Sequence, residues 1–177
     1  MTEFHGSRRT VTQSIESEAS RDEVVGVLAE ATRIPEWAPA FVDRVTGDAR
    51  SGWLATKDGQ DFALRVMVDQ GAGTVDYLRE VGPGREGGAY LRAVPRPGGG
   101  SVIAMTLPLL PGVNPTDTAA TLAQELDALA ALVERHLNSA GTTLPRSDVV
   151  QAGGAEVFGP GTGGWALISS ANTRNSG

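Results

Sequence analysis

Residues 114–137 read NPTDTAATLAQELDALAALVERHL, an uninterrupted helical pattern late in the chain. Asn114 is a good N-cap residue, and Pro115 suits the first helical position, where no backbone donor is needed. Apolar residues recur every three or four positions and form one stripe. The stripe consists of Leu122, Leu126, Leu129, Val133 and Leu137. Such a stripe has to pack against another apolar surface, and the preceding sequence predicts a sheet that offers one.

Short strands separated by turn sequences precede this helix. We expect six of them, at residues 40–46, 52–56, 61–69, 74–81, 88–94 and 102–107. The links between them are short and rich in Gly, Asp and Pro, which favours hairpins. Strands joined by hairpins run antiparallel, so this part of the chain is predicted to be a six-stranded meander.

The first part of the chain predicts one more strand and two short helices. Residues 9–17 alternate between apolar and polar side chains, as in a half-buried strand. Ser20 and Glu23 have the spacing of a capping box at a helix start. A second short helix is expected at residues 32–37 and has to end before Ala40, because Pro39 interrupts it.

The length and composition indicate one domain and a tail. Of the 177 residues, 1–138 are sufficient for a single buried core, and residues 139–177 are rich in Gly, Ser, Thr and Pro. We expect this tail to be disordered. Its apolar piece, Trp165 to Ile168, is a candidate for docking on the domain or on a protein partner.

Charge and hydropathy exclude several classes of partner. The net charge is −6, and the basic residues are dispersed, so no basic patch for nucleic acid is expected. No apolar run is long enough for a membrane span, and none follows the polar start as in a signal peptide. The sequence therefore predicts a soluble, cytoplasmic protein.

The sequence offers little for metal or cofactor chemistry. It has no cysteine, and its two histidines, His5 and His136, are not paired by spacing, so neither a metal site nor a cofactor is predicted. Residues 82–87 and 159–164 match GxGxxG. The first match leads into another expected strand and the second lies in the tail, so neither has the strand–helix setting of a dinucleotide site.

The order of these elements resembles the START-like or helix-grip superfamily (SRPBCC), which includes polyketide cyclase/dehydrase domains and Bet v 1 allergens. Residues 33–39, RIPEWAP, resemble the segment after the first helices, and residues 98–105, GGGSVIAM, resemble the glycine-led entry to the last strand. The resemblance covers residues 8–138. It implies an α+β fold: a strand, two short helices, a six-stranded antiparallel meander and a long C-terminal helix over the concave sheet.

The resemblance also implies a cavity between the sheet and the last helix for a largely apolar molecule, such as a lipid or polyketide. Strand alternation predicts which residues face it. The inward set is Phe62, Leu64, Val66, Val68, Val75, Tyr77, Leu91, Ala93, Ile103 and Met105. The candidate ligand-binding residues are Trp37, Phe41, Trp53, Phe62, Leu64, Val66, Tyr77, Leu91, Arg92, Met105, Leu129 and Val133.

Polar anchors for the ligand depend on strand register. Tyr77 is expected inside and is the best single polar contact. Tyr90 and Arg92 face solvent on the alternation given above, where Arg92 can form cross-strand pairs, but the opposite register turns both into the cavity. The remaining in-strand candidates are Arg65, Asp76 and Arg79.

Three functions are compatible with these features. The first is a binding or carrier domain for an apolar small molecule. The second is a cyclase- or dehydratase-like enzyme that folds a reactive chain and supplies one or two proton-transfer groups. The third is an interaction module that recruits a protein through the tail.

Overall fold

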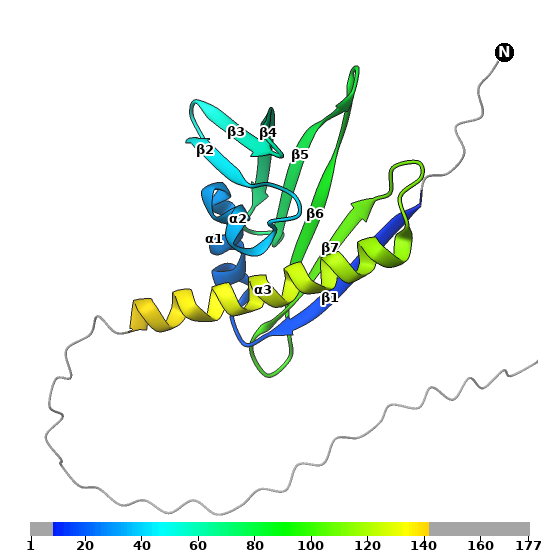
Figure 1. Ribbon diagram of the computed structural model, residues 1–177. Coiled ribbons are helices and arrows are strands. Elements are labelled where there is room, and N and C mark those ends of the chain that lie inside the picture. The colour runs from blue at the N-terminus through cyan, green and yellow to red at the C-terminus, as the bar shows by residue number, and fades with distance from the viewer. Residues whose placement is uncertain (1–8, 142–177) are drawn as a thin grey trace, which may run out of the picture. The chain divides into compact units, whose positions relative to one another are not determined.

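A computed structural model describes residues 9–141, with side chains as far as residue 139. It contains a seven-stranded antiparallel sheet in the order β1-β7-β6-β5-β4-β3-β2, together with short helices and a long C-terminal helix (Figure 1). The strands are β1 (Thr10–Ser17), β2 (Arg44–Asp48), β3 (Gly52–Lys57), β4 (Gln60–Asp69), β5 (Thr74–Gly82), β6 (Arg85–Pro95) and β7 (Ser101–Pro108). The helices are α1 (Arg21–Ala29), the 3-10 helix η1 (Ala31–Arg33), α2 (Ile34–Trp37) and α3 (Pro115–Gly141). The predicted α+β helix-grip architecture is confirmed.

The core lies between the concave face of the sheet and the helices. Strand alternation places Val75 and Tyr77 of β5, Leu91 of β6, and Ile103 and Met105 of β7 on the inner face, where all are buried. The predicted stripe of α3 faces them, because Leu122, Leu126, Leu129 and Val133 are each at most 2% exposed. Figure 1 shows α3, in yellow, crossing β7 and β1, with which it makes contacts.

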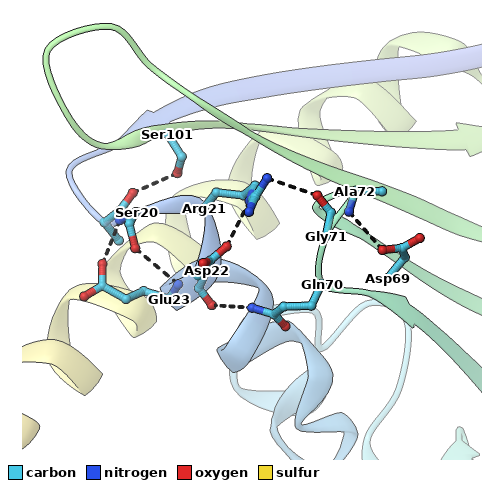
Figure 2. Close-up of polar contacts among 10 residues, drawn as sticks. Ser20, Arg21, Asp22, Glu23, Asp69, Gln70, Gly71, Ala72 and Ser101 are labelled. Carbon is cyan, nitrogen blue, oxygen red and sulfur yellow. Dashed lines mark hydrogen bonds and ion pairs between the residues drawn. The ribbon is translucent and has the colours of Figure 1, made fainter.

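The start of α1 is fixed to the sheet by a chain of polar contacts (Figure 2). The capping box is present: the Ser20 backbone N–H donates to the Glu23 carboxylate, and the Glu23 N–H donates to the Ser20 hydroxyl. Arg21 donates to the carbonyl oxygen of Gly71 in the β4–β5 turn, at 3.1 Å. These contacts hold the start of α1 against the turn between β4 and β5.

Several strand boundaries differ from the sequence prediction. β2 begins at Arg44 instead of residue 40, because the N–H groups of Phe41 and Val42 donate to the carbonyl of Ala38 in a turn. β5 ends at Gly82 and β6 begins at Arg85. Residues 82–87 therefore form a tight hairpin around Gly84, whereas the sequence predicted a longer link. One inward prediction also fails: Val68, near the end of β4, was expected inside and is 44% exposed.

The end of the domain also differs from the prediction. α3 continues to Gly141, so residues 139–141 belong to the helix and not to the tail. The predictions for the remainder of the tail, including the docking piece Trp165 to Ile168, fall outside the described residues. Within residues 9–141, no helix combines the length and the apolar character that crossing a membrane requires.

Candidate ligand cavity

A cavity of about 520 Å³ lies between the inner face of the sheet and the first half of α3. Its walls come from α2, the segment at Phe41, the β5–β6 hairpin, β7, the loop after β7, and α3 from Asp117 to Glu125. The inner end is closed by buried side chains: Trp37, Tyr77, Met105 and Leu122. At the outer end the lining residues Leu110 and Val113 are 48% and 45% exposed, so this end opens to solvent.

The cavity exists at this end because other side chains fill the remainder of the layer under α3. Leu91, Leu129 and Val133 are each 0% exposed and belong to the continuous core with α1. They therefore do not line the cavity, although the sequence predicted that they would. Of the twelve candidate residues, only Trp37, Phe41, Tyr77 and Met105 line it.

The candidates on β3 and β4 lie on the inner face but beside the cavity. Trp53, Phe62 and Val66 are half-buried and pack against the core, and Leu64 is inside it. Phe62 contributes indirectly, because its ring packs against the ring of Phe41 with a centroid separation of 6.2 Å. The alternation that predicted these residues to point inward is correct for the face, but the cavity occupies a different part of that face.

The Arg92 prediction is corrected by the register of β6. Leu91 and Ala93 face the core, so the alternation places Arg92 and Tyr90 on the other side of the sheet. Arg92 forms an ion pair there with Asp76 of the neighbouring strand. Tyr90 nevertheless forms part of the cavity wall, whereas Arg92 does not. The opposite register, which would have turned Arg92 into the cavity, is not formed because it would expose Leu91 and Ala93.

Tyr77 also differs from its expected role. Its ring lines the cavity beside Trp37, with 6.0 Å between the ring centroids. Its hydroxyl, however, donates a hydrogen bond to the carbonyl oxygen of Leu28 near the end of α1. Burial raises the pKa of this hydroxyl well above its usual value. The hydroxyl is therefore engaged in the core and is not the polar contact that the sequence predicted.

Arg79 is the half-buried cation of the cavity, whereas Arg85, which also lines it, is exposed. Arg79 follows Tyr77 on the inner face of β5. Its guanidinium carbon lies 4.9 Å from the ring centroid of Phe62 and 5.7 Å from that of Phe41, in cation–π contact with both. Its side chain makes no ion pair or hydrogen bond with another residue of the described part of the chain.

Glu125 is the buried acid of the cavity, whereas Glu86 and Asp117, which also line it, are exposed. Glu125 projects from α3 and is only 8% exposed. No other residue within 9–141 forms a hydrogen bond or an ion pair with its carboxyl group. Burial raises the pKa of this carboxyl to about 7, because removal from water disfavours the charged form.

A third polar group in the wall lacks a partner. Trp37 is 2% exposed, and its Nε1–H has no acceptor among the described residues. A buried donor without an acceptor is costly. The nitrogen atom itself has almost no exposed surface, so it lies behind the cavity wall.

Sequence reasoning missed Glu125 and left Arg79 without a position, although both carry a signal. Glu125 is three residues after Leu122 and four before Leu129, so it interrupts the apolar stripe of the helix. Arg79 is two residues after Tyr77, so the alternation that places Tyr77 inside places Arg79 inside as well. An ionisable residue in a predicted apolar face is the sign that identifies both.

Together these features define a helix-grip domain with a cavity beneath its C-terminal helix. No family model matches the sequence, and no curated protein matches it. Solved structures do match in their coordinates. The Zhui aromatase/cyclase from Streptomyces sp. R1128 has a TM-score of 0.55 and 16% identity, over 76% of this chain and 99% of that one.

Two further solved structures have a fold similar to that of this chain. A START superfamily protein from Mycobacterium smegmatis has a TM-score of 0.55 and 17% identity, over 72% of this chain and 98% of that one. Norcoclaurine synthase from Thalictrum flavum was solved as a point mutant with a transition state analogue. It has a TM-score of 0.55 and 19% identity, over 74% of this chain and 97% of that one. The chain therefore has the START-like, helix-grip fold that the order of its elements predicted.

Proposed function

We propose that this protein binds a small, largely apolar molecule in the cavity between the sheet and α3, and that it does so in the cytoplasm. The observation that supports this most directly is the cavity itself, which stays open although the adjoining core is fully packed. Its volume of about 520 Å³ is within the range of roughly 300–1,000 Å³ that is typical of small-molecule sites.

The test uses N-phenyl-1-naphthylamine, a neutral apolar probe that fluoresces more strongly away from water. Thr121 lines the cavity from α3, whereas Gln124 lies on the exposed side of the same helix. We expect Thr121→Trp to fill the opening and weaken probe binding about tenfold or more, equivalent to about 1.4 kcal/mol. Gln124→Trp is the matched control and leaves binding within about twofold of the original.

Two outcomes count against binding in the cavity. The first is a folded protein whose titration gives no saturable fluorescence increase. The second is equal affinity in the two tryptophan variants, because a site elsewhere on the surface would be indifferent to Thr121.

A second candidate function is an enzyme of the cyclase or dehydratase type, and Glu125 favours it. A carboxyl with a pKa of about 7 exchanges protons readily near neutral pH and suits a general acid or base. The test substrate is a linear poly-β-carbonyl thioester. We expect Glu125→Gln to abolish cyclisation while it retains binding of N-phenyl-1-naphthylamine, and Arg92→Ala, on the outer face, to change neither. Equal turnover with and without Glu125 would remove this candidate.

A further inference from the structure

Among the charged side chains that line the cavity, Arg79 is half-buried and Glu125 is buried, whereas Arg85, Glu86 and Asp117 are exposed. Arg79 and Glu125 differ in how they can respond to burial. Arg79 keeps its positive charge at any ordinary pH, because a guanidinium is not deprotonated in proteins. Glu125 escapes the cost of burial by taking up a proton. In its protonated form the acid carries no charge, so the permanent charge inside the cavity is positive.

The surroundings of Arg79 prepare it for an anion. The rings of Phe41 and Phe62 hold the guanidinium from two sides, which limits its motion. Nothing in residues 9–141 supplies a carboxylate to it: the nearby rim acid Glu86 is paired with Arg65 on the sheet. A planar, pre-positioned guanidinium with free donors is the usual protein group for binding carboxylate, sulfonate or phosphate oxygens.

We propose that the ligand of this cavity is an amphipathic organic anion whose acidic group binds Arg79 and whose apolar body lies towards Met105 and Leu122. This assignment rests on the proposed binding function and adds the chemical class of the ligand. Protonated Glu125 has a free hydrogen-bond donor, so it also suits a ligand oxygen.

Two probes of nearly the same shape separate charge from apolar contact. 8-Anilinonaphthalene-1-sulfonate has the ring system of N-phenyl-1-naphthylamine with one added sulfonate. We expect Arg79→Gln to weaken binding of the sulfonate probe about tenfold, the scale of a lost charge-assisted hydrogen bond, and to leave the neutral probe within about twofold. Arg79→Lys, which restores a positive charge, recovers part of the loss.

Arg92→Gln is the matched control. It removes the same charge from the neighbouring strand but on the outer face, where Arg92 pairs with Asp76. We expect both probes to bind this variant as they bind the original protein. An equal loss in Arg79→Gln and Arg92→Gln would show only a change in net charge and would overturn the assignment.

A competition experiment on the unchanged protein guards against a variant that does not fold. Decanoate and decanol are added against bound N-phenyl-1-naphthylamine. We expect decanoate to displace it at about tenfold lower concentration than decanol. If decanol competes equally well, the anion assignment is wrong while the binding function stands. If the neutral probe never binds, the binding function fails as well.

Discussion

The hydroxyl of Tyr77 donates a hydrogen bond to the carbonyl oxygen of Leu28 and so ties the centre of the sheet to the last turn of α1. The last carbonyls of a helix lack partners within it, so this hydroxyl satisfies an acceptor that is otherwise buried. We expect Tyr77→Phe to lower the free energy of unfolding by about 1–2 kcal/mol. Urea denaturation measures the loss, and unchanged affinity for N-phenyl-1-naphthylamine would confirm that the hydroxyl is structural.

Glu125 makes stability depend on pH. Its pKa is about 7 in the folded protein and near 4.5 when unfolded, so between these values the folded state keeps a proton that the unfolded state has lost. Stability therefore falls as pH rises through this window, by about 2 kcal/mol after allowance for partial solvent access. Urea unfolding at pH 5 and pH 8 measures the change.

Glu125→Gln is the control for that measurement, because it removes the titrating group and keeps the shape. The other titratable groups that line the cavity are Tyr77, Arg79, Arg85, Glu86, Tyr90 and Asp117. On two elements that pack against α3, Glu16 of β1 is paired with Arg96, and Glu36 of α2 with Arg33. These groups stay in the variant, so an identical pH dependence with and without Glu125 would refute the assignment.

Gly73 is required by the turn between β4 and β5. Its φ is +69°, and a Cβ there would lie 2.2 Å from the carbonyl oxygen of Ala93. Gly59 has a similar φ of +76° but open space around it. We expect Gly59→Ala to lower the free energy of unfolding by about 1–2 kcal/mol through backbone strain alone. Gly73→Ala is expected to lower it further, because the backbone at Ala93 also has to move. Equal melting temperatures would contradict this difference.

The apolar stripe of α3 is buried against the sheet, so truncating it is expected to destabilise the domain. Leu126, on the buried side of α3, is 1% exposed, whereas Leu54 on β3 is 47% exposed. We expect Leu126→Ala to lower the free energy of unfolding by about 2–5 kcal/mol, because apolar burial is lost and a space is left in the core. Leu54→Ala, the same change at an exposed position, should stay within about 0.5 kcal/mol. Similar denaturation midpoints for the two variants would mean that α3 is not packed as described.

Periodic patterns made the fold predictable. Alternation placed Leu91 inside and hence Arg92 outside, and the spacing of Leu122 and Leu126 gave the buried side of α3. Local patterns could not show that Phe41 lies in a turn, because its N–H bonds to Ala38 instead of a strand partner.

The cavity was harder to predict than the fold. Alternation tells which face a side chain is on, but not which part of that face the helices leave open. The sequence therefore predicted that Leu129 and Val133 line the cavity, whereas the structure buries them in the core. Glu125 was missed because its importance comes from burial without a partner, which only the packed structure reveals.

The position of a bound probe can be measured directly. Intermolecular nuclear Overhauser effects are measured between bound N-phenyl-1-naphthylamine and the methyl groups of the protein. We expect contacts with Met105 and Leu122, which line the cavity, and none with Leu54 or Met67, which are exposed. Contacts with Leu54 or Met67 in place of the first pair would contradict a site between the sheet and α3.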